Sequence, residues 1–428
     1  MATRRQVLGW TAAMGLGGLG LATAGCDGST NGLPKRAVPD DALVLDADGG
    51  IVVLSAATGR AVVPPGLGVL SGDGTLLARS ETVPGGTRLT SLRLPSGQPV
   101  ASAVLPDPLM ARAVSRDGTL VALADPTPAG GSPYRPAGRE RTTIVVAGAA
   151  GQRNRLELAG NLEPEAFDTS GSYLYILDYL PPAAPDRYRV RTVEIATGAV
   201  ETLYTRDKEP VPSGAEEEMR GEGRQAVFDG IRNLLFTLYT HQPDHLHTRG
   251  LIAGVHPGTQ QVHAFVHTLS LDARWAYCVD LPAPFGANPA AGHAIAMRPA
   301  GSRLAVVDAW SGAVALIDPG DLRVAETAAL RPPRGPIETA SALFTPDGTL
   351  LVAAGREVLT WRPGTTVDDV TRWPVPDTIQ GAALVGDRLY VGQPGAALEL
   401  DPATGRVPRR VPIPSGARLN AALTQAPA

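Results

Sequence analysis

Cysteine and lysine are nearly missing from this 428-residue chain, and so are long apolar runs. The two cysteines are Cys26 and Cys278, and the two lysines, Lys35 and Lys208, leave 36 of the 38 basic residues as arginine. Two cysteines cannot supply a framework of several disulfides. Beyond the first 26 residues no segment approaches the ~20 apolar residues of a spanning helix. The formal net charge of −4 gives no basic footprint for nucleic acid.

Several catalytic signatures are also missing. The chain has no G-x-S-x-G elbow and no P-loop, which removes support for an elbow-type serine hydrolase and for an NTPase. It has no H-E-x-x-H and no C-x-x-C motif. The glycine-rich run 15–20 matches the dinucleotide fingerprint in letters, but it follows no strand and therefore predicts no nucleotide site.

The first 26 residues predict where in the cell the protein is located. Residues 3–8 (TRRQVL) resemble the twin-arginine export motif, and residues 23–26 (TAGC) resemble a lipobox, with Thr23 where that pattern prefers leucine. The resemblance implies that residues 1–25 are a cleaved signal and that Cys26 carries a lipid. Residues 26–41 would then be a polar tether that holds the protein at the outer face of the cytoplasmic membrane.

Repetition indicates the fold. Each copy has a short apolar run, a tight turn with Gly, Asp or Asn, and a second apolar run, which is typical of a β-hairpin. A second hairpin usually follows, so each unit holds four strands, as in a β-propeller blade. Residues 42–428 are therefore predicted to form one all-β propeller. The seven copies are 67–80, 111–125, 164–178, 224–240, 293–310, 340–355 and 380–393.

Residues 304–330 resemble the YVTN-type repeat of extracytoplasmic propellers. That family, like WD40-like propellers in general, includes binding proteins, scaffolds and several classes of enzyme, so the resemblance implies a fold and not an activity.

The two ends of the repeat region predict ring closure. Residues 42–65 align with the last three strands of the final blade, so the first blade lacks its initial strand. Residues 417–425 align with an initial strand that nothing follows. We expect this C-terminal strand to complete the N-terminal blade, because closure leaves no open sheet edge. The count is then eight blades, with seven as the alternative.

Long connections are predicted to gather on one face of the disc. In a four-stranded blade the second–third loop and the connection to the next blade leave at the same edge. All the long segments are of these two kinds, which makes this long-loop face the expected working surface. They are residues 126–141, 180–188, 207–223, 241–261 and 282–292.

Histidines concentrate in one of these loops. Six of the seven lie within 27 residues, and the sequence HQPDHLH places His241, Asp244, His245 and His247 at close spacing. Imidazole suits Zn, Cu, Fe and Ni, so His241, His245 and His247 are candidate ligands of a transition metal. A histidine-rich surface loop without metal is the alternative. Asp280, at the end of a predicted strand, is a candidate ligand contact.

Arginines in neighbouring loops offer a second kind of contact. Arg135 and Arg187 are candidates for binding an anionic ligand, because guanidinium pairs well with carboxylate and phosphate. They are equally able to pair with the run 216–218 (EEE), which is otherwise interpreted as a solvated loop segment. Cys278 lies among apolar residues and is interpreted as an inert buried thiol.

Two classes of function stay open at this point. The first is a membrane-tethered binding scaffold that holds a glycan, peptide or protein on its long-loop face. The alternative is a propeller enzyme (a lactonase, lyase, hydrolase or metal-dependent oxidoreductase) with its site in the central channel. A transition metal is the one cofactor that the sequence suggests.

Overall fold

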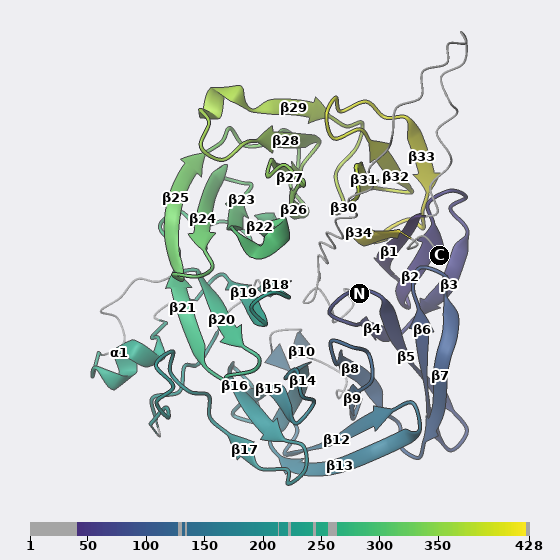
Figure 1. Cartoon of the computed structure of the whole chain (residues 1–428), viewed down its shortest axis with the longest axis vertical. Helices are drawn as coiled ribbons and strands as arrows, with labels where there is room; N and C mark the ends of the chain where they lie inside the picture. The colour runs from purple at the N-terminus through teal and green to yellow at the C-terminus, as the bar shows by residue number, and fades with distance from the viewer. Residues whose placement is uncertain are drawn as a thin grey trace, which may run out of the picture.

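The computed structural model describes residues 41–126, 131–132, 135–212, 214–220, 224–242, 245–255 and 263–424. In these residues eight four-stranded antiparallel sheets surround a central axis, and one two-stranded ribbon is added (Figure 1). The propeller is therefore eight-bladed, and the seven-bladed alternative is wrong. The predicted signal, Cys26, the tether up to its last residue and Asp244 lie outside the described residues.

The first four blades follow the chain from the N-terminus. Blade 1 contains β1 (Asp41–Ala47), β2 (Gly50–Ser55) and β3 (Ala61–Gly66), with β34 (Arg418–Thr424) as its innermost strand. Blade 2 contains β4 (Gly68–Leu70), β5 (Leu76–Val83), β6 (Gly86–Arg93) and β7 (Gln98–Leu105). Blade 3 contains β8 (Met110–Val114), β9 (Val121–Ala124), β12 (Arg141–Gly148) and β13 (Gly151–Ala159). Blade 4 contains β14 (Asn161–Phe167), β15 (Tyr173–Leu180), β16 (Arg187–Glu194) and β17 (Val200–Glu201).

The other four blades continue in chain order. Blade 5 contains β18 (Arg224–Asp229), β19 (Leu234–Tyr239), β20 (Phe265–Ser270) and β21 (Ala276–Asp280). Blade 6 contains β22 (His293–Met297), β23 (Leu304–Asp308), β24 (Ala313–Asp318) and β25 (Arg323–Ala329). Blade 7 contains β26 (Ala340–Phe344), β27 (Leu350–Ala354), β28 (Glu357–Trp361) and β29 (Thr371–Pro374). Blade 8 contains β30 (Ala382–Val385), β31 (Arg388–Gln393), β32 (Ala396–Leu400) and β33 (Arg409–Pro412).

The turn within the repeated phrase explains its sequence. Ser71 Oγ donates to Asp73 Oδ1 over 2.6 Å, and the same oxygen accepts the N–H of Thr75 over 2.9 Å. Gly74 has a φ of 71°, which costs glycine little and strains other residues. The S-x-D-G-T sequence therefore closes its own turn through side-chain hydrogen bonds to backbone. The same bonds recur between Ser115, Asp117 and Thr119 in blade 3.

The core lies between neighbouring blades. Tyr175 and Leu177 of blade 4 pack with Tyr239 and Phe265 of blade 5 in one buried cluster. Similar clusters join other pairs of blades around the ring. Because both faces of each sheet are covered, the strands are apolar along their length, as β19 (LLFTLY) is.

The C-terminal strand closes the ring. β34 pairs antiparallel with β1 through six residue pairs, from Asp41 with Thr424 to Asp46 with Arg418, which confirms the predicted closure. Asp41, the first residue of β1, is 2% exposed and is bound by blade 8. Arg388 Nε and Nη2 donate to its two oxygens over 2.6 and 2.7 Å, and the Tyr390 hydroxyl donates over 2.7 Å.

The long-loop face carries the additions to the repeat. The ribbon of β10 (Gly131–Ser132) and β11 (Arg135–Pro136) lies between β9 and β12, and helix α1 (Thr248–Ile252) lies between β19 and β20. Three 3₁₀ turns complete the elements: η1 (Ala290–Gly292), η2 (Pro299–Gly301) and η3 (Val367–Asp369). No helix in the described ranges has the length and apolar character that crossing a membrane requires.

Candidate metal centre

Four side chains of types that can ligate a metal meet at the outer part of blade 5, on the long-loop face. Glu217 comes from the connection between blades 4 and 5, His245 and His247 come from the β19–β20 loop, and Cys278 comes from β21. Glu217 Oε1 lies 2.7 Å from His245 Nε2, 2.8 Å from His247 Nδ1 and 2.9 Å from Cys278 Sγ. The two histidines approach each other to 3.2 Å between His245 Nε2 and His247 Nδ1.

The cluster is enclosed by the protein. The His245, His247 and Glu217 side chains are 1%, 2% and 10% exposed, and Cys278 is buried. The His245 ring stacks on Phe265 of β20 with centroids 4.2 Å apart, and the His247 ring meets the same phenyl group edge-on. Phe265 therefore fixes both imidazole planes so that one nitrogen of each faces Glu217.

A second layer of contacts orients His247. Its Nε2 is hydrogen-bonded to Asp280 Oδ1 at the end of β21, and Arg249 of α1 donates to Asp280 Oδ2 over 2.8 Å. Arg249 also donates to the carbonyl oxygen of Cys278 over 2.8 Å. A carboxylate on the far nitrogen of a histidine is the usual support of a metal ligand, because it fixes the tautomer and raises the basicity of the ligating nitrogen.

The protonation of the cluster follows from these contacts. Burial by itself would raise the pKa of Glu217, but hydrogen bonds from His245 and His247 hold it well below its ordinary value. Burial would lower the pKa of His247, yet the hydrogen bonds to Asp280 and Glu217 raise it to about 9. Burial, together with the nearby charge of Glu217, raises the pKa of the Cys278 thiol well above its ordinary value. Without an ion, Glu217 is therefore an ionised carboxylate, and His247 and Cys278 beside it carry protons that a metal ion could displace.

The donor set fits a borderline transition metal. Two imidazoles, a thiolate and a carboxylate are ligands of tetrahedral Zn²⁺, with bonds of about 2.0–2.3 Å and ligand–ligand separations of about 3.3–3.6 Å. The ligand atoms of Glu217, His247 and Cys278 all lie within 4.8 Å of one another. The separations from Glu217 Oε1, 2.7–2.9 Å, need to open by only several tenths of an ångström to admit an ion.

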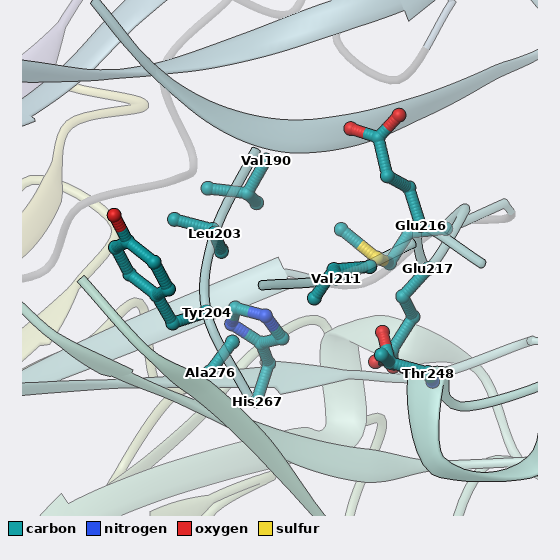
Figure 2. A pocket seen from close by; sticks show the side chains of 10 residues that line it. Val190, Leu203, Tyr204, Val211, Glu216, Glu217, Thr248, His267 and Ala276 are labelled. Atoms are coloured by element: carbon teal, nitrogen blue, oxygen red, sulfur yellow. Dashed lines mark hydrogen bonds between the residues drawn. The ribbon is translucent and has the colours of Figure 1, made fainter. Parts of the chain in front are cut away.

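A small pocket adjoins the cluster on the side of blade 4. Its polar lining comes from Glu216, Glu217, Thr248 and His267. Figure 2 shows Glu217 turned toward Thr248, whereas its neighbour Glu216 points to the opposite side. The other lining residues are mostly apolar: Val190, Leu203, Tyr204, Val211, Met219 and Ala276.

The structure places the predicted site residues in different surroundings. It brings together His245, His247 and Asp280. His241 does not join them: its Nδ1 contacts the Thr240 hydroxyl, and its ring meets His293 edge-on at 6.3 Å. Arg187 forms ion pairs with Asp186 (2.8 Å) and Glu218 (2.7 Å), and Arg135 is exposed in β11.

Two members of the cluster were not predicted. The run 216–218 was interpreted as solvated, and that is wrong, since the Glu216 and Glu217 side chains are 11% and 10% exposed. Cys278 is buried, as predicted, but the contact of its Sγ with the carboxylate of Glu217 was not predicted. The one available signal was the coincidence of an acidic run, a histidine-rich loop and the remaining cysteine on neighbouring segments of the same predicted face.

The comparisons with known proteins find similarity among solved structures alone. No protein-family model and no curated protein sequence matches the chain. Among solved structures it is similar to apo AztD from Citrobacter koseri, with 12% identity and a TM-score of 0.49 over 91% of this chain and 99% of that one. It is similar to the dihydro-haem d1 dehydrogenase NirN in complex with DHE, with 13% identity and a TM-score of 0.48 over 93% and 77%.

The periplasmic gluconolactonase PpgL of Pseudomonas aeruginosa is a third similar structure, with 16% identity and a TM-score of 0.40 over 80% of this chain and 96% of that one. All three are β-propellers, the fold class that the strand order of this chain itself shows. Similarities of this size carry no argument about ligand or activity.

Proposed function

We propose that this protein is an extracytoplasmic binding propeller whose ligand is a transition-metal ion of the zinc class, held by Glu217, His245, His247 and Cys278. The observation that carries the proposal is the approach of three potential ligand atoms to within 2.9 Å of one buried carboxylate oxygen. Among the described residues, the ionisable nitrogen partners within ion-pair distance of Glu217 are the two histidines. A metal ion would take the place of the protons that now lie between Glu217 and its histidine and thiol partners.

The donor types narrow the class of ion. Thiolate and imidazole disfavour Mg²⁺ and Ca²⁺, which take oxygen ligands, and favour Zn²⁺, Cu⁺ or Ni²⁺. A carboxylate in the set favours a divalent ion of borderline softness. We assign a binding role because the triad of Glu217, His247 and Cys278, with His245 beside it as a fourth donor, would complete a tetrahedral ion from protein side chains alone, which is typical of a closed site.

The proposed location rests on the N-terminal sequence. The twin-arginine-like residues 3–8 and the lipobox-like residues 23–26 support export and a lipid anchor at Cys26. The long-loop face would then present the ion site outside the cytoplasmic membrane, on a body held by a short polar tether.

Metal analysis tests the proposal. The full chain is purified through an affinity tag without histidine and is analysed by mass spectrometry for metal content, then titrated with Zn²⁺ against a chromophoric chelator. We expect one ion per chain. Glu217→Gln and Cys278→Ser should each abolish stoichiometric binding, because each removes an anionic ligand from the set.

His241→Gln is the matched control. It removes an imidazole from the same loop, four residues from His245, but one that lies outside the cluster. Its stoichiometry and affinity should equal those of the wild-type protein. Failure of the wild-type protein to bind any transition metal, or equal loss of binding in His241→Gln and Cys278→Ser, would overturn the proposal.

A further inference from the structure

We infer that residues 216–219 form a strap that is held in place by arginines of blade 4. Within it, Glu216 is a positioning residue that orients Glu217 toward the proposed ion. This inference rests on the proposed metal binding and identifies what sets its affinity. Glu216 itself does not reach the ion, because its carboxylate lies on the other side of the strap (Figure 2).

The strap occupies a place that the blade leaves empty. The outermost strand of blade 4, β17, has only two residues and pairs with Thr192 and Val193 of β16. The earlier part of β16 therefore has no partner from β17. The strap covers it: Tyr188 and Met219 exchange both backbone hydrogen bonds, with N···O distances of 3.1 and 2.8 Å. A segment from the next connection thus takes the position of an outer strand.

A charge-balanced group fixes the strap side chains. Glu216 Oε2 lies 2.7 Å from Arg189 Nη1 and 2.6 Å from Arg191 Nη2, and Arg191 Nε also donates to Glu216 Oε1 over 2.7 Å. Asp178 of β15 lies 2.9 Å from Arg189 Nε. Two acids and two arginines are 10–22% exposed and neutralise each other. Charge-assisted, forked contacts of this kind hold geometry well.

Alternation along the strap then directs Glu217. In an extended segment successive side chains point to opposite sides. Glu216 and Glu218 both face arginines of β16, and Glu217 between them faces His245, His247 and Cys278 of blade 5. A carboxylate whose neighbours are anchored in this way is pre-organised, so less ordering remains to be done when an ion binds.

Glu216→Gln tests the positioning role against a matched control on the same strap, Glu218→Gln. Zn²⁺ affinity is measured by chelator competition, and Co²⁺ is used as a spectroscopic probe. Glu216→Gln should weaken Zn²⁺ binding about 10- to 100-fold, the range found for residues that support metal ligands. Glu218→Gln should weaken it less, because Glu218 has one arginine partner and is 36% exposed. Arg191→Gln, which removes a cation from the same clamp, should resemble Glu216→Gln.

The Co²⁺ spectrum shows whether Glu216 positions Glu217 or only stabilises the fold. In Glu216→Gln, the Co²⁺–thiolate charge-transfer band should persist, because Cys278 lies on β21, while the ligand-field bands should shift with the carboxylate. A lower melting temperature of the metal-free variant with wild-type Zn²⁺ affinity and spectrum would overturn the inference. That result would leave the proposed function standing if Glu217→Gln still abolishes binding. Absence of binding in the wild-type protein would instead refute the proposed function.

Discussion

Two buried carboxylates in this propeller have opposite kinds of partner. Asp41 in the closing blade is held by Arg388, a permanent cation, and by the hydroxyl of Tyr390. Glu217 is held by two imidazoles and a thiol, all of which can exchange a proton for a metal. The first arrangement is complete and belongs to the architecture. The second is completed only by protons or an ion, which is what distinguishes a candidate site from a structural ion pair.

Deleting residues 415–428 should have the largest effect on the closing blade. It removes β34 with its six residue pairs and exposes the inner edge of β1. At about 1 kcal/mol for each lost ladder hydrogen bond, plus the buried Leu419, we expect a loss of at least 5 kcal/mol or failure to fold. Thermal unfolding followed by circular dichroism measures this. An unchanged melting temperature would contradict the closure.

Asp41→Asn and Glu217→Gln test the comparison directly in metal-free protein. Asp41→Asn leaves the largely buried Arg388 with only the exposed Asp387, 3.5 Å away, as a counter-charge, so the free energy of unfolding should fall by roughly 3 kcal/mol. Glu217→Gln should change it by less than about 1 kcal/mol, because its partners can adjust their protons and the amide oxygen still accepts hydrogen bonds. Urea denaturation of both variants provides the measurement. Equal destabilisation would remove the distinction between the two clusters.

His293, a buried histidine outside both carboxylate clusters, should have a smaller effect on stability. Burial lowers its pKa, against the opposing charge of Asp308, so the folded state favours the neutral ring. Stability from this group is full above the unfolded pKa of about 6.5 and declines as pH falls through it, by at most about 1.4 kcal/mol per pH unit. Melting temperatures between pH 7.5 and 5 should therefore fall more steeply in the wild-type protein than in His293→Gln. Parallel profiles would contradict this assignment.

The ring was predictable because it repeats. The hairpin phrase and the matching ends indicated eight blades and the closing strand, and the strand order confirms both. Sorting the loops by the antiparallel order of the strands also predicted the face on which His245, His247 and Asp280 lie. These inferences needed only local periodicity and connectivity.

The cluster itself was harder to predict from the sequence, because its members are distant along the chain. Glu217 and Cys278 are 61 residues apart, and they meet because the strap lies beside the part of β16 that the short strand β17 does not pair with. No local pattern indicates that replacement. His241 is near His245 in sequence, yet its backbone has a φ of 57°, so the chain turns there and carries its side chain toward His293.

The two-residue strand β17 has a consequence for solubility. The outer edge of β16 would otherwise present unpaired backbone groups, which are templates for strands of other molecules and hence for aggregation. The strap covers this edge with a single backbone bridge and with ion pairs from Glu216 and Glu218 to arginines of β16. The same short segment that carries the proposed ligand Glu217 thereby also protects an exposed sheet edge from pairing with other molecules.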